Sequence, residues 1–88
     1  MSLFNSIFNT KEQKAASKFF KIFDYDSTFV NITLDIRNAK DYTNMKQIMS
    51  SIKNFKERFA TNEKVKDDVE NLNNRLETKF DMLEAAGL

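Results

Sequence analysis

The side chains that could do chemistry in this chain are carboxylates, lysines, tyrosines and hydroxyls. The 88 residues contain no cysteine and no histidine. Thiolate nucleophiles, disulfides, imidazole bases and the usual zinc ligands are therefore absent. One glycine and no proline also argue against a glycine-rich loop that cradles a phosphate group. We expect a protein that is not an enzyme and that holds no metal ion and no cofactor.

The carboxylates of the second half of the chain recur at helical spacing. They include Glu63, Asp67, Glu70, Glu77, Asp81 and Glu84. Residues 61–88 carry seven acidic and four basic side chains, a net charge of −3, whereas residues 1–60 carry six acidic and ten basic ones, a net charge of +4. An acidic face of this kind is a solvated helix surface, or it meets a lysine stripe of the same molecule or of another one.

A lysine stripe of the opposite sign lies in the first half of the chain. A capping-box sequence from Thr10 to Gln13 predicts that a helix begins at Lys11 and runs to about residue 23. Its broad apolar face comprises Ala15, Ala16, Phe19, Phe20, Ile22 and Phe23. Its lysines recur every three or four residues, as a solvated face or as a surface for an anionic partner. Lys14, Lys18 and Lys21 are candidate partner-binding residues.

The helical spacing of Leu3, Phe4, Ile7 and Phe8 predicts a short amphipathic turn over residues 1–8. Such a turn covers one end of a core, or it acts as an anchor that inserts into a groove of a partner. Phe4 and Phe8 are the candidate anchors.

Residues 28–36 are the most ambiguous segment. The polar run from Asp24 to Ser27 predicts a break in the first helix, and apolar residues then alternate with polar ones, namely Val30, Ile32, Leu34 and Ile36 with Asn31, Thr33 and Asp35. This period of two favours a strand; the alternative is a helix that is apolar nearly all round. The chain has no second alternating run, so we expect the strand to pair with another molecule through Val30, Ile32 and Leu34.

The second half of the chain predicts an antiparallel helical hairpin of about residues 39–59 and 62–86. The first helix, capped by Asn38, has its apolar stripe at Met45, Ile48, Met49, Ile52, Phe55 and Phe59. The second, capped by Thr61 or Asn62, has its stripe at Val65, Val69, Leu72, Leu76, Leu83 and Ala86. Gly87 stands where a left-handed helix end needs no side chain. We expect a single, mainly α domain.

Size and composition favour an interaction protein. A chain of 88 residues is near the lower end of the size at which one core suffices, so oligomerisation would stabilise it. It has neither an apolar run long enough to span a membrane nor a secretory signal, which predicts a cytoplasmic protein. Its asparagine, lysine, phenylalanine and isoleucine content is typical of AT-rich genomes such as those of many phages. We expect a homo-oligomeric binder or inhibitor of a macromolecular partner, most simply a protein.

A strand followed by two helices over residues 29 to about 75 loosely resembles the ribbon-helix-helix regulators. That resemblance implies two strands paired across a dimer, with Asn31, Thr33 and Arg37 facing the DNA major groove. Asp35 would then also face DNA, the first helix is longer than in that family, and no glycine stands between the helices. A nearly neutral chain also has little charge for phosphate contacts.

A third candidate function is the binding of a nucleotide at a site between subunits. Phe4, Phe8, Tyr25 or Tyr42 would stack on a base, and lysines would bind the phosphates.

Overall fold

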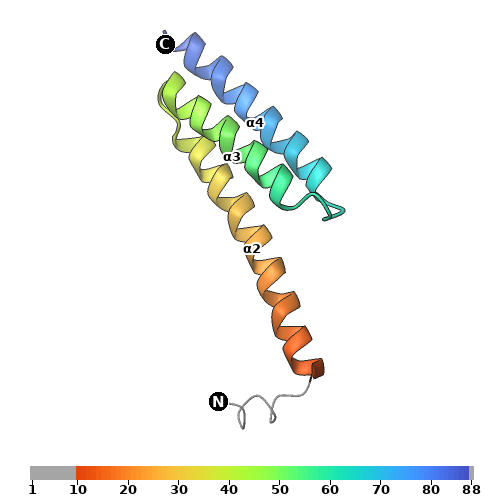
Figure 1. Cartoon of the computed structure of the whole chain (residues 1–88). Coiled ribbons are helices and arrows are strands. Elements are labelled where there is room, and N and C mark those ends of the chain that lie inside the picture. Colours follow the sequence, from red (N-terminus) through yellow and green to blue (C-terminus); the bar gives the residue numbers. More distant parts are fainter. Residues whose placement is uncertain (1–9, 88) are drawn as a thin grey trace.

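The computed structural model describes residues 10–87, with side chains from residue 17 onward, and this part of the chain is three α-helices (Figure 1). Helix α2 spans Thr10–Asn38, α3 spans Tyr42–Arg58 and α4 spans Val65–Ala85. The predicted mainly α fold and the antiparallel hairpin, which is formed by α3 and α4, are confirmed. The predicted turn over residues 1–8 lies outside the described residues.

The ends of the hairpin helices differ in detail from the predicted caps. Asp41, rather than Asn38, caps α3, because its extended backbone lets the carboxylate accept a hydrogen bond of 2.8 Å from the Asn44 amide. The side chain of Asn62 accepts from the Lys64 amide at 2.8 Å, just before α4 begins. Gly87 follows α4 with a φ of +94°, the left-handed conformation predicted for this position.

Helix α2 is continuous where the sequence predicted a break and a strand, and both of those predictions were wrong. The hydroxyls of Ser27 and Thr28 donate to the carbonyl of Asp24 at 3.2 and 2.7 Å, so polar side chains of the expected break bond to their own helix. The Asp24 carboxylate pairs with Arg58 of α3. Residues 28–36 satisfy their backbone groups within α2, whereas a lone strand would leave them without partners.

The core lies where one side of α2 packs on the hairpin. Tyr25, Ile32 and Ile36 are buried on that side of α2, and they meet Phe55 of α3 and Leu72 of α4, which are 1% and 0% exposed. Aromatic rings fill the part of this interface nearest the turn between α3 and α4. The ring of Tyr25 lies 5.0 Å from the rings of both Phe55 and Phe59. The other buried core residues are Ala39, Met45, Ile48, Ile52, Val65, Val69 and Leu76.

Helix α2 is much longer than the hairpin beside it. Its 29 residues extend about 43 Å, whereas the 17 residues of α3 extend about 25 Å. Residues 10–23, which we call the overhang, therefore project beyond the turn between α3 and α4 (Figure 1). The described chain measures 63 × 25 × 15 Å with a radius of gyration of 18.0 Å, against about 12 Å for a compact domain of this length.

Replacement of Leu72 by alanine tests the core. The side chain is fully buried, so Leu72→Ala should lower the free energy of unfolding by about 3 kcal/mol through lost apolar contact and a residual cavity. Urea denaturation followed by circular dichroism measures this loss. Met49→Ala on α3 is the control, because Met49 is 60% exposed and should change stability by less than about 0.5 kcal/mol. Equal effects of the two variants would contradict the described core.

Candidate functional site

The candidate site is the side of α2 that faces away from the hairpin. Four large apolar side chains lie there and are open to solvent: Phe19 is 62% exposed, Phe23 61%, Val30 52% and Leu34 45%. Their spacing of four, seven and four residues places them in one stripe along about 22 Å of helix. We call these four residues the outer face of α2.

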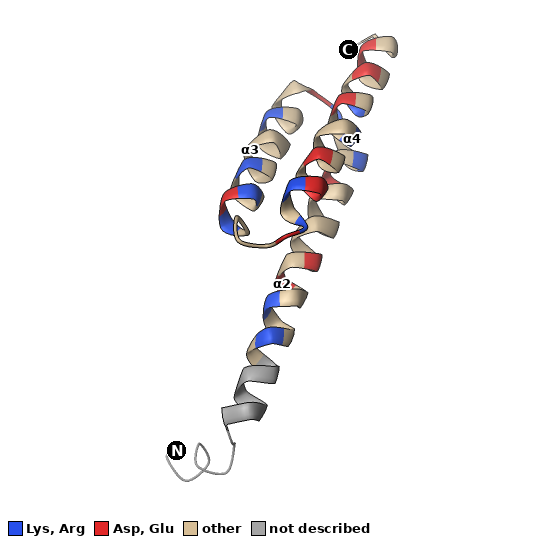
Figure 2. Cartoon of the chain, turned by 90° about the vertical axis from the view of Figure 1, so that its right-hand side faces the viewer, with Lys and Arg blue, Asp and Glu red and all other residues tan. Residues whose placement is uncertain are grey.

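The opposite side of α2 changes character where the hairpin ends. Along the hairpin this inner side is apolar, with Tyr25, Ile32 and Ile36 buried. Helical spacing continues the same side to Lys21 and Lys18 in the overhang, and both lysines are exposed. Figure 2 colours the basic and acidic positions along the three helices. In the overhang the inner side carries two lysines together with Ile22, which precedes Tyr25 by three residues and is 54% exposed. The outer face is apolar at its four named residues, with Asp26 and Ser27 between Phe23 and Val30.

The exposed phenylalanines of the overhang contact one another. The rings of Phe19 and Phe23 are 6.4 Å apart and nearly parallel, and Phe20 meets Phe19 edge to face at 5.8 Å. Phe20 is 65% exposed and Ile22 54%. Together these residues make the overhang the richest exposed apolar surface among the described side chains.

The predicted partner-binding residues fall in different places. Val30 and Leu34 lie on the outer face, and Lys18 and Lys21 lie on the inner side of the overhang. Ile32 is only 3% exposed and belongs to the core, so it has no surface to offer a partner. Lys14 is in α2 but its side chain lies outside the described part of the chain, and Phe4 and Phe8 lie outside the described residues.

Sequence reasoning missed the phenylalanines of the outer face. Phe19 and Phe23 were expected on the apolar face of a separate helix over residues 11–23. The phase of one continuous helix would have identified them: Tyr25, Ile32 and Ile36 share one side, and Phe19, Phe23, Val30 and Leu34 share the other.

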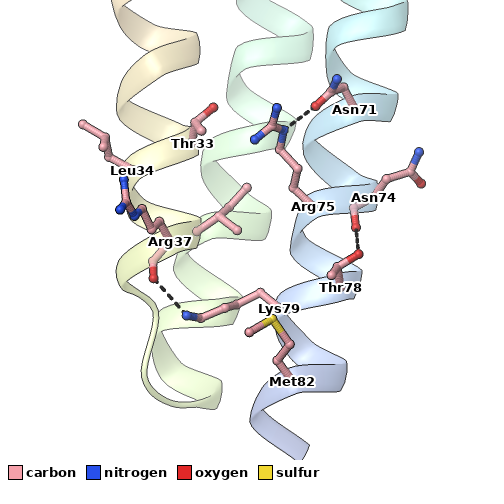
Figure 3. Close-up of a pocket in the computed structure, with 10 residues that line it drawn as sticks. Thr33, Leu34, Arg37, Asn71, Asn74, Arg75, Thr78, Lys79 and Met82 are labelled. Atoms are coloured by element: carbon pink, nitrogen blue, oxygen red, sulfur yellow. Dashed lines mark hydrogen bonds between the residues drawn. The ribbon is translucent and has the colours of Figure 1, made fainter.

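A shallow groove of about 700 Å³ runs between α2 and α4 and carries positive charge (Figure 3). Three of its ten lining residues are the cations Arg37, Arg75 and Lys79, and none of the ten is acidic. The other lining residues are Thr33, Leu34, Ile36, Asn71, Asn74, Thr78 and Met82. Guanidinium groups favour carboxylates and phosphates, so this groove can attract an anionic group.

Hydrogen bonds within the groove give two of its cations structural roles. The Lys79 ammonium donates to the carbonyl of Arg37 at 2.9 Å, and so satisfies a free carbonyl at the end of α2 (Figure 3). The Arg75 Nε donates to the Asn71 side chain at 2.6 Å on the same helix. The groove is open, and its cations already stabilise the bundle.

A second groove, between α3 and α4, is apolar. It has a volume of about 570 Å³ and is lined by Tyr42, Met45, Lys46, Met49, Asn73, Leu76, Glu77 and Phe80. The rings of Tyr42 and Phe80 are 5.7 Å apart. This groove begins at the start of α3, at the end of the hairpin far from the overhang (Figure 1), so Tyr42 is remote from Lys18 and Lys21.

The one strongly perturbed titratable group among the described residues is Tyr25. Its hydroxyl donates a hydrogen bond to the Asp68 carboxylate of α4. Burial raises the pKa of Tyr25 well above its ordinary value near 10, and the hydrogen bond and negative charge of Asp68 add to the effect. This neutral, hydrogen-bonded phenol joins α2 to α4.

Among the described side chains, those of residues 17–87, no group of three or more acidic residues could hold a metal ion. None of the three described helices has the length and apolar content to cross a bilayer.

Comparisons of the chain with models of known protein families, with curated proteins and with solved structures find no significant match.

The contact between Tyr25 and Asp68 predicts a pH dependence of stability. Because the folded state raises the pKa of Tyr25, its contribution is full below about pH 10 and is lost as the pH rises further, when the unfolded state ionises first. Tyr25→Phe should cost about 1 kcal/mol of unfolding free energy at neutral pH. It should also reduce the fall in stability between about pH 10 and pH 12.

Denaturation with urea at a series of pH values measures both effects. Tyr42→Phe is the matched control, because Tyr42 is 45% exposed and should leave the alkaline fall unchanged. An alkaline profile of Tyr25→Phe identical to that of the unmodified chain would contradict the assignment.

Proposed function

We propose that the chain is a non-enzymatic helical interaction protein that self-associates and binds or inhibits a macromolecular partner through the outer face of α2. The observation that carries this proposal is the difference between the two sides of the overhang. Its inner side carries Lys18 and Lys21, and its outer side carries Phe19 and Phe23, which are 62% and 61% exposed. In the overhang, the inner side that no longer faces the hairpin is mainly basic, with Ile22 as its apolar residue, whereas the outer side exposes two phenylalanines.

Exposure of an apolar stripe of this size to water is unfavourable in free energy. The outer face and Phe20 expose on the order of 500 Å² of apolar side-chain surface, which is near the largest patch that ordinary monomeric proteins leave open. Aromatic side chains are also the type most enriched in the centres of protein interfaces. A protein surface that covers Phe19 and Phe23 would remove this area from water, and no change in the bundle is needed to expose it.

The composition supports the non-enzymatic part of the proposal. The chain has no histidine and no cysteine, and the buried hydroxyl of Tyr25 is bound to Asp68. A general base or nucleophile would therefore have to come from surface carboxylates or lysines, whose solvated setting gives little activation.

The two alternative functions have less support. The ribbon-helix-helix plan needs a strand at residues 29–36, which instead lie in α2. A nucleotide site was expected to use Phe4, Phe8, Tyr25 or Tyr42 together with lysines, between subunits. Phe4 and Phe8 lie outside the described residues, and Tyr25 is only 4% exposed. Tyr42 lines an apolar groove in which Lys46 is the one cation, so that groove offers little charge for phosphates.

Site-specific photo-crosslinking tests the proposed binding surface. Replacement of Phe23 by p-benzoylphenylalanine keeps an aromatic group on the outer face. Irradiation should therefore yield covalent adducts, with the purified chain or in an extract of the native host, that denaturing electrophoresis and mass spectrometry detect. The same replacement at Met49 is the control, since this residue is equally exposed, at 60%, but lies on α3.

The yield of adducts from position 23 should exceed that from position 49 several-fold. Equal yields in both samples would contradict the outer face as the binding surface.

A further inference from the structure

We infer that the outer face of α2 binds the same face of a second copy of this chain, with the two α2 helices antiparallel about a two-fold axis between Asp26 and Ser27. This inference rests on the proposed function and names one partner for its binding surface. It follows from the spacing of the exposed residues, from the area available and from the position of the hairpin.

The spacing of the outer face is self-complementary. Its residues follow one another at intervals of four, seven and four, and this series is the same when it is reversed. A two-fold axis at its centre therefore places Phe19 of one copy beside Leu34 of the other, and Phe23 beside Val30. Each layer then combines one aromatic and one aliphatic side chain, which keeps the distance between the helices even. A parallel pair would combine two phenylalanines at one end and two smaller residues at the other.

The area is sufficient for a specific dimer. Each copy contributes on the order of 500 Å² of apolar surface from the outer face and Phe20, so a dimer would bury about 1,000 Å² from these residues alone, the lower limit for specific interfaces. The flanking residues add to this area. An isologous contact of this kind is closed, because each copy uses the same surface and leaves none free for a third.

The bundle leaves room for the second copy. The α3–α4 hairpin lies along one side of α2 (Figure 1), and the four residues of the outer face remain 45–62% exposed. In the antiparallel arrangement the overhang of one copy runs beside the second half of α2 in the other. Phe19 of the first copy then lies beside Leu34 of the second, a residue that also lines the groove in Figure 3.

The same arrangement has one unfavourable contact. Asp26 lies beside the centre of the outer face and is exposed, and an antiparallel two-fold axis brings Asp26 of both copies to the same flank. Two like charges at this distance repel each other. We therefore expect a dimer of moderate affinity. Removal of the negative charge of Asp26 should strengthen it. In a parallel pair, Asp26 would instead face Ser27 of the other copy.

Sedimentation equilibrium of the full chain tests the second copy as partner. We expect a monomer–dimer equilibrium at micromolar concentration. Phe23→Asp should raise the dissociation constant by about 100-fold or more, because the change enters the interface twice. Since Phe23 does not touch the core, the Phe23→Asp variant should keep the helical circular dichroism of the unmodified chain. Met49→Asp is the matched control on α3 and should leave the equilibrium unchanged.

Single cysteines test the antiparallel orientation in a chain that has none of its own. Ser27→Cys lies next to the axis and should form a disulfide-linked dimer on mild oxidation. Arg37→Cys should not, because antiparallel pairing separates the two copies of this residue by about 30 Å along the helices. In addition, Asp26→Asn should lower the dissociation constant about threefold.

The outcomes separate this inference from the proposed function. A monomer throughout the micromolar range, or a dimer that Phe23→Asp leaves intact, overturns the second copy as partner. A dimer that is linked through position 37, or weakened by Asp26→Asn, overturns the antiparallel arrangement. If the purified chain stays monomeric and position 23 still crosslinks selectively to another protein in the host extract, the partner-binding part of the proposed function stands, whereas self-association and the dimer do not. If position 23 gives no selective adduct in either sample, both fail.

Discussion

The packing of one side of α2 on the α3–α4 hairpin determines the rest of the molecule. Tyr25 is the first α2 residue in this core; its ring packs on Phe55 and its hydroxyl bonds to Asp68 near the start of α4. This contact sets the rotation of α2 about its own axis, and therefore which side chains face outward. It also sets the point where the helix leaves the bundle, because nothing in the hairpin extends beyond the turn between α3 and α4.

The overhang is consequently a surface whose two sides have different chemistry. Lysines on the inner side disfavour its packing on a second hairpin, since an ammonium group loses hydration when it is buried. Phenylalanines on the outer side supply the apolar area that an interface requires. The charge asymmetry of the sequence therefore corresponds to two surfaces. Basic residues keep the inner side of the overhang in contact with water, and acidic residues form the solvent-exposed surface of α4.

The hairpin could be predicted from the sequence, because α3 and α4 each have one apolar stripe and therefore one helical phase. Helix α2 has two stripes on opposite sides, and residues two apart in a helix point about 200° apart. Val30 and Leu34 on the outer side, with Ile32 and Ile36 on the inner side, consequently imitate the alternation of a strand. The missing strand partner was the clue against that reading. The groove cations on α2 and α4 come together only through tertiary packing, so no sequence pattern could reveal them.

The continuity of α2 across the edge of the bundle also implies a gradient of local stability within one helix. Residues near Ile32 and Ile36 open only when the core opens, since both side chains are buried in it. Residues 17–23 have exposed side chains and depend on helical hydrogen bonds alone, which are marginal in water without tertiary packing. Their amide hydrogens therefore exchange with solvent far sooner than those one or two turns beyond Tyr25. A partner that covers the overhang would slow that exchange. Amide hydrogen exchange in residues 17–23 would therefore report whether a partner is bound there.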